Sequence, residues 1–207
     1  MHIEIAGDGP LMVIGGPYSN LRATEAAMAE ARRLGIGPER VICTGDVVAY
    51  CAEPEETAQL IAAWGCHVIQ GNCEQQIAAG ADDCACNFEE GTECAALAKG
   101  WYPFAAARVS AEMQAWMGGL PATLTFDLAG LRFRVVHGGT REISRWVFAS
   151  EAASIAEECE LAASDVVIAG HCGIPFIGRS GNRTWFNAGV IGMPGTMILW
   201  NIRKAPR

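Results

Sequence analysis

The chain has 207 residues, of which 51% are hydrophobic and 18% are charged, and this balance excludes a disordered protein. Its formal net charge of −8 argues against nucleic acid or an anionic membrane as the main partner, since both favour basic patches. The N-terminus lacks the pattern of a signal peptide and no apolar run is long enough to span a membrane. We therefore expect a cytoplasmic protein whose nine cysteines are mostly reduced.

The first third of the chain alternates short apolar runs with helical patterns. Strands are predicted at 11–14, 41–43 and 67–69, and helices at 21–34 and 55–64. Either of the two polar residues just before the first helix could cap it. This β-α-β-α-β order favours parallel strands that are joined by right-handed crossovers.

The middle of the chain, 80–118, is predicted to be an irregular and helical insertion. Its first part, 80–94, contains acidic residues and cysteines without a clear period. The Ala-rich stretch 93–118 indicates one or two helices, which we expect to be broken near Gly100 and Pro103.

The second half of the chain turns to β structure. A hairpin is predicted between 122–127 and 131–137, followed by a helix at 151–161 and a strand at 166–169. The remaining predicted strands are 176–177, 184–187 and 197–201. We expect a single domain over 1–207, in which two sheets pack together with helices outside.

Polar side chains follow four predicted strands at their carboxyl ends. These side chains are Asp46, Asn72, His137 and His171. In open α/β sheets this edge is where ligands bind. One carboxylate, one amide oxygen and two imidazoles suit a divalent ion such as Mn, Fe, Ni or Zn, so we expect a metal site here.

Five sequence blocks resemble the motifs of calcineurin-like metallophosphoesterases, in the order in which that family has them. The blocks are 44–48, 71–74, 136–139, 170–173 and 187–194. The last of them is similar to the tail of the small bacterial phosphodiesterase-like branch. The resemblance implies the metallophosphatase fold, a four-layer α/β/β/α sandwich of two mixed sheets. It also implies a metal-dependent hydrolase of phosphomonoesters or phosphodiesters.

The family binds two metal ions, and the chain departs from the family pattern at one of them. Gly16 stands where the family has Asp, while Tyr18 and Gly173 stand where it has His. In the family all three positions serve one ion. The resemblance therefore implies that this ion is lost, and that the bridging Asp46 retains the other ion together with the amide and the two imidazoles. We expect one divalent ion, weak or lost activity, and only 80–94 as a source of replacement ligands.

Three further roles follow from the resemblance and from local sequence. Cys73 replaces the family's usual catalytic His, and its thiol could still donate a proton. Glu74 matches an acidic residue that orients its neighbours. Asn20, at the start of a predicted helix, could help the helix N-terminus to hold a phosphate.

Three functions are left open by the sequence. The first is a phosphoesterase with a reduced, one-metal centre. The second is a catalytically degenerate module that binds or scaffolds a small phosphorylated ligand. The third is a thiolate zinc or redox protein, in which Cys73, Cys172 and the Cys84/Cys86 pair bind metal with the two site histidines. We expect no membrane partner, and the sequence leaves a homo-oligomer open.

Overall fold

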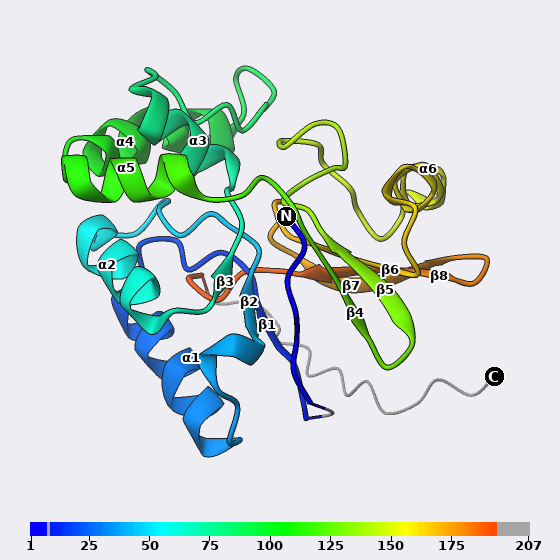
Figure 1. The fold of residues 1–207 in the computed structure, drawn as a ribbon. Helices are drawn as coiled ribbons and strands as arrows, with labels where there is room; N and C mark the ends of the chain where they lie inside the picture. The colour runs from blue at the N-terminus through cyan, green and yellow to red at the C-terminus, as the bar shows by residue number, and fades with distance from the viewer. Residues whose placement is uncertain (8, 194–207) are drawn as a thin grey trace.

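A computed structural model of the chain describes residues 1–7 and 9–193. Its centre is a pair of packed β-sheets with helices on both outer sides (Figure 1). The smaller sheet is parallel and consists of β1 (Met12–Ile14), β2 (Val41–Cys43) and β3 (His67–Val68). The larger sheet is mixed, in the order β4 (Leu124–Leu128), β5 (Leu131–Val135), β6 (Val166–Ala169), β8 (Arg183–Ala188) and β7 (Pro175–Ser180).

Helices cover the two free faces and one end of this pair of sheets (Figure 1). The helices α1 (Leu21–Arg33) and α2 (Pro54–Trp64) flank the smaller sheet, and a short 3-10 turn (Pro38–Arg40) leads into β2. The helix α6 (Ala152–Ala162) packs on the larger sheet. The helices at the end are α3 (Asn72–Ala79), α4 (Glu93–Ala106) and α5 (Ala111–Gly119).

The strands β2 and β6 are buried on both faces, as their apolar runs predict, whereas β4 and β5 have one buried and one more exposed face. Successive side chains of β2 alternate between faces, so Ile42 packs toward the larger sheet while Cys43 packs toward the helices. Phe126 and Phe133 stack on the other side of the same interface, with ring centroids 4.7 Å apart. The expected four-layer sandwich is therefore confirmed, with the smaller sheet parallel rather than mixed in its three strands.

The predicted strands and helices lie within three residues of the observed ones, apart from two differences. The helix α3 was not predicted. The break in 93–118 lies at 107–110 and not at Gly100 or Pro103, since α4 runs through both residues. Packing overrides the weak local propensity, because Trp101 and Tyr102 are buried in the core at this point. The strand expected at 197–201 lies outside the described residues.

Candidate metal centre

Four connections bring polar side chains to one edge of the sandwich, beyond the carboxyl ends of the parallel strands. Asp46 follows β2, and Asn72 begins α3 just after β3. His137 follows β5 and His171 follows β6. All four side chains are buried, with at most 5% of each residue exposed. The topology of the two sheets therefore brings together the four polar side chains that the sequence predicted to lie at one edge.

The backbone at this edge is held in uncommon conformations. Asp46 has φ 54° and His171 has φ 59°, in the left-handed region that non-glycine residues rarely adopt. Gly71 can only be glycine, because a Cβ there would lie 2.5 Å from both the backbone nitrogen and Oδ1 of Asp46. Such strained positions gather at functional sites, where the surrounding structure holds them.

The ligand atoms converge at distances that suit one cation. Nε2 of His137 lies 3.0 Å from Oδ1 of Asn72, 3.2 Å from Nδ1 of His171 and 3.3 Å from Oδ2 of Asp46. Donor atoms about 2.1 Å from an ion stand about 3.0 Å apart at right angles and about 3.4 Å apart at tetrahedral angles. All three distances fall between these values.

The hydrogen bonding of His137 also favours a cation. Its Nδ1 lies 2.6 Å from the backbone oxygen of Thr44, so Nδ1–H donates there, and in the neutral imidazole Nε2 carries the lone pair. Four lone pairs then face one another in a buried space, and a positive ion is the partner that relieves this repulsion. The residues present therefore fit a divalent metal ion.

The electrostatic environment keeps two of these groups in the state that a metal requires. Burial and then the neighbouring His137 lower the pKa of His171 to about 4, so this imidazole is neutral near pH 7. Burial raises the pKa of Asp46, but the two histidines outweigh it, and the net pKa lies below the ordinary value. For His137, burial lowers the pKa and the Asp46 carboxylate raises it, with a net increase. A metal ion must therefore displace a proton from His137 at moderately acid pH.

Glu74 and Cys73, the two predicted catalytic residues, follow Asn72 in the first turn of α3. Oε2 of Glu74 accepts hydrogen bonds from the backbone N–H groups of Asp46 (2.8 Å) and Gly71 (2.9 Å), so it orients the metal-binding loops. Burial and then Asp46 raise its pKa to about 7. Burial, followed by Asp46 and Glu74, raises the pKa of Cys73 well above its ordinary value, so its thiol keeps the proton.

Tyr18 fills the space beside Asp46 where the resemblance places a second ion. A Cβ on Gly16 would lie 2.5 Å from Cε1 of the Tyr18 ring, and a Cβ on Gly173 would lie 3.8 Å from its hydroxyl oxygen. The ring thus runs between the two glycines that replace family ligands. Burial and then Asp46 raise the Tyr18 pKa well above its ordinary value, so the phenol stays neutral.

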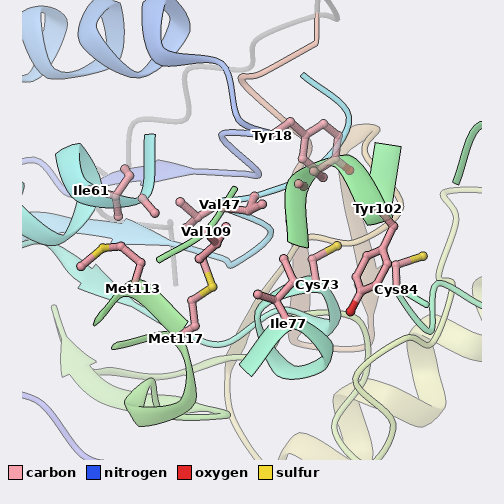
Figure 2. Packing of buried hydrophobic residues seen from close by; sticks show 14 of the residues in the cluster. Tyr18, Val47, Ile61, Cys73, Ile77, Cys84, Tyr102, Val109, Met113 and Met117 are labelled. Atoms are coloured by element: carbon pink, nitrogen blue, oxygen red, sulfur yellow. The ribbon is translucent and has the colours of Figure 1, made fainter. Parts of the chain in front are cut away.

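The Tyr18 ring is fixed in place by its backbone and by aromatic neighbours. The backbone of Tyr18 has a strained φ of 54°, and the backbone N–H of Tyr18 donates to the backbone oxygen of Asp46 at 3.1 Å. The ring packs against Tyr50 with centroids 4.9 Å apart. In Figure 2, Tyr18 lies on the same side of the buried cluster as Cys73 and Tyr102. No local sequence pattern indicated that this side chain would turn inward.

The segment 80–94 reaches the site, but through hydrogen bonds rather than as a ligand. Nδ2 of Asn72 donates to the backbone oxygen of Cys84 at 2.7 Å and lies 3.2 Å from Sγ of Cys86. Cys84 and Cys86 form a disulfide with each other. The indole N–H of Trp146 donates to the backbone oxygen of Cys86 at 3.0 Å, and the indole packs on His171 with centroids 4.4 Å apart.

Other candidate residues are engaged elsewhere. Asn20 caps α1 by accepting from the N–H of Ala23 at 3.0 Å, and its Nδ2 donates to the backbone oxygen of Gly192 at 2.7 Å. Its role in phosphate binding stays a prediction, and these two bonds count against it. His2 bonds to Thr125, and His67 to the backbone oxygen of Glu39, so neither supplies a ligand here.

Among the described residues, Asp46, His137 and His171 form the group of acidic, histidine and cysteine side chains whose ligand atoms lie close enough for one ion. No cysteine joins this group. A surface hollow of about 320 Å³, lined by Asp127 and Arg132 among others, lies at the amino ends of β5 and β6 and thus away from the site. No helix in the described part of the chain is both long and apolar enough to cross a membrane.

Comparison with known proteins gives a family and a fold. A sequence profile described as the calcineurin-like phosphoesterase superfamily domain matches residues 2–204. A 62-residue stretch is 36% identical to the uncharacterised protein MJ0912 of Methanocaldococcus jannaschii and covers 30% of this chain but only 25% of that protein.

Two solved structures share the fold. Protein PH1004 of Pyrococcus horikoshii gives a TM-score of 0.72 at 18% identity, covering 89% of this chain and 77% of its own. A metallophosphoesterase of Sphaerobacter thermophilus gives a TM-score of 0.69 at 19% sequence identity, and the match covers 91% of this chain and 79% of that protein's chain. At these identities the likeness extends to the fold alone.

Proposed function

Because the chain belongs to the calcineurin-like phosphoesterase superfamily, we propose that it is a phosphoesterase with a reduced, one-ion metal centre. The observation that carries this proposal is the position of Nε2 of His137, within 3.3 Å of three other ligand atoms. The Tyr18 ring takes up the neighbouring space, which argues for one ion rather than two. The proposed substrate is a small phosphomonoester or phosphodiester.

Each residue of the site has a defined part in this proposal. Asp46, Asn72, His137 and His171 would hold the ion, whose divalent charge, when bound, polarises a phosphoryl oxygen and neutralises its developing negative charge. Glu74 holds the Asp46 loop through backbone amides. The protonated thiol of Cys73 lies beside Asp46 and is available as a proton donor.

Loss of the second divalent charge should make the enzyme slow. Electrostatic stabilisation of this kind contributes several kcal/mol to a transition state, and about 1.4 kcal/mol changes a rate tenfold. A reduction of several orders of magnitude relative to a two-ion centre is therefore the expected result.

A second candidate function is a module that binds a phosphorylated ligand without turnover. The Tyr18 ring beside Asp46 favours it, because without a second ion the charge that stabilises the transition state is reduced while one ion could still bind a phosphate. The third possibility, a thiolate zinc protein, is disfavoured by the absence of cysteine from the group of close ligand atoms among the described residues.

Metal titration combined with a hydrolysis assay tests the proposal. Metal-free protein should bind one Mn²⁺ per chain and hydrolyse an aryl phosphate or a bis-aryl phosphodiester slowly. His137→Ala should abolish both properties, whereas His67→Ala, away from the site, should leave them unchanged. Two tightly bound ions per chain, or turnover that survives His137→Ala, would contradict the one-ion proposal. Binding of a phosphorylated ligand with no turnover would support the second candidate instead.

A further inference from the structure

A buried disulfide lies against one of the proposed metal ligands. Cys84 and Cys86 are bonded to each other and are only 4% and 6% exposed. Both contact the amide nitrogen of Asn72, one through its backbone oxygen and the other through its sulfur. We propose that the Cys84–Cys86 pair is a redox modification site, and that its reduction by a dithiol weakens metal binding at Asn72. This inference rests on the metal centre of the proposed function.

The Asn72 amide binds a metal only when its oxygen faces the ion. Its Oδ1 lies 3.0 Å from Nε2 of His137, so the opposite side of the amide, Nδ2, must face away from the ion. The partner of Nδ2 is the backbone oxygen of Cys84 at 2.7 Å. Asn72 is fully buried, so water cannot replace that partner without an opening of the segment. The Cys84 carbonyl therefore orients the metal ligand, in the manner of other outer partners of metal sites.

The same segment also contacts a second ligand through Trp146. The indole N–H donates to the Cys86 carbonyl, and the indole ring packs against His171. A movement of Cys86 would therefore act on two of the four ligand side chains at once. Residues 81–92 contain no helix or strand, so this stretch depends on side-chain contacts, such as Phe88 against Trp146 with ring centroids 5.6 Å apart, and on the disulfide.

The covalent bond adds a restraint within this irregular segment. It closes a small ring around Ala85, which has φ 48°, and so fixes the Cys84 carbonyl relative to the Cys86 sulfur. Reduction restores rotation about these torsions, and ordering them again opposes metal binding. Loss of an outer partner typically lowers metal affinity about 10–100-fold, and we expect a change of this size.

The redox step is an ordinary thiol–disulfide exchange. A thiolate of the dithiol attacks one sulfur of the pair, the Cys84–Cys86 bond breaks, and a mixed disulfide forms. The second thiol of the reductant then displaces the cysteine. Two electrons and two protons end on Cys84 and Cys86, while the reductant leaves as a cyclic disulfide.

The test compares the oxidised and reduced full chain, with the reductant removed under nitrogen. Alkylation of the unfolded chain should label seven cysteines before reduction and nine after it. Free Mn²⁺, measured by electron paramagnetic resonance during titration, should give an affinity about 10–100-fold weaker for the reduced chain. In metal-free protein the side-chain amide resonances of Asn72 should shift on reduction, which reports the hydrogen bond without any metal.

Matched variants separate this pair from a general effect of thiols. The Cys84→Ser/Cys86→Ser double variant, checked for folding by circular dichroism, should have the weak affinity in both conditions. Cys94→Ser removes an exposed free thiol of the neighbouring helix and should keep the full difference. Asn72→Asp retains a ligand oxygen but has no N–H to donate, so its Mn²⁺ affinity should not respond to the reductant.

The results distinguish failure of this inference from failure of the proposed function. Equal Mn²⁺ affinity of the oxidised and reduced chain would overturn the inference and leave the metal centre standing. Nine labels without reductant, after equilibration with a disulfide reagent, would overturn it as well. Absence of Mn²⁺ binding in both states would refute the metal centre, and the Asn72 resonances would then decide on their own whether the pair controls the amide.

Discussion

A substitution at Gly16 tests whether the Tyr18 ring occupies the place of the missing metal ligands. In Gly16→Ala the new methyl group would lie 2.5 Å from Cε1 and 2.7 Å from Cδ1 of the ring, closer than real Cβ contacts. Movement of the ring costs free energy, because Tyr50 packs on it and because the backbone N–H of Tyr18 donates to the backbone oxygen of Asp46. Overpacking of this kind costs about 1–3 kcal/mol, which we expect as the loss of unfolding free energy.

A double-mutant cycle isolates that clash. Tyr18→Ala removes the ring, so Gly16→Ala should become nearly neutral in that background, with a coupling energy of about 1–3 kcal/mol. Urea denaturation of metal-free protein measures the four free energies. Gly119→Ala provides the exposed control, because a Cβ there meets nothing within 4 Å and the backbone has no positive φ. The reasoning is refuted if Gly16→Ala costs the same in both backgrounds, that is, if the coupling is below about 0.5 kcal/mol.

Three more predictions concern the metal ligands. We expect the triple variant Gly16→Asp/Tyr18→His/Gly173→His to bind two metal ions per chain instead of one and to turn over substrate faster. It should also be less stable, because Gly173 has φ 72°, which a histidine rarely adopts. A metal content that stays at one ion per chain would count against the assignment of the lost site. His137→Ala should abolish Mn²⁺ binding in a calorimetric titration, and retained binding would exclude it as a ligand. The pKa of His171, about 4, lies below the ordinary 6.5. Between these two pH values the unfolded chain binds more protons than the folded chain, so the free energy of unfolding decreases as the pH is lowered. Relative to His171→Gln, the metal-free protein should lose about 3 kcal/mol from pH 7 to pH 4 in urea denaturation; parallel pH profiles would argue against a neutral buried imidazole.

The four residues of the candidate metal centre could be placed together from sequence, because their position follows from topology. Asp46, Asn72, His137 and His171 each come just after an apolar run, and parallel strands place such residues at one edge. No knowledge of side-chain packing was needed for this step. The sequence could not predict the distances of 3.0–3.3 Å from Nε2 of His137 to the other three side chains, but it did predict that the four side chains would lie close together.

The helix α3 could also have been predicted, because its start carries a signal. Gly71 is followed three residues later by Glu74, and an acidic residue at that position commonly returns a hydrogen bond to the helix start. Oε2 of Glu74 does accept from the N–H of Gly71. The short length of this helix, Asn72–Ala79, and its place inside a family motif hid the pattern.

Two features of the site were beyond local sequence reasoning. The segment 80–94 has no period, so no pattern in it indicated that Cys84 and Cys86 would fold back against Asn72. The inward turn of Tyr18 depends on the strained φ of 54° and on contacts with residues distant in the chain. Both features arise from tertiary packing, which no local pattern encodes.

Gly16, Tyr18 and Gly173, the three positions that depart from the family pattern, form one packing unit, and this packing supports the proposal that one of the two ions is lost as a whole. The space that a carboxylate at position 16 would need is the space that the ring fills, whereas a Cβ at Gly173 would make only an ordinary contact with the phenol oxygen, at 3.8 Å. Gly16→Asp alone would therefore produce a clash with the ring instead of a ligand. Asp46, which would bridge two ions in the family, here has His137 and His171 as its charge partners, and their effect on its pKa favours the carboxylate form. Under the one-ion proposal, a second cation would have to displace the buried Tyr18 side chain before it could bind.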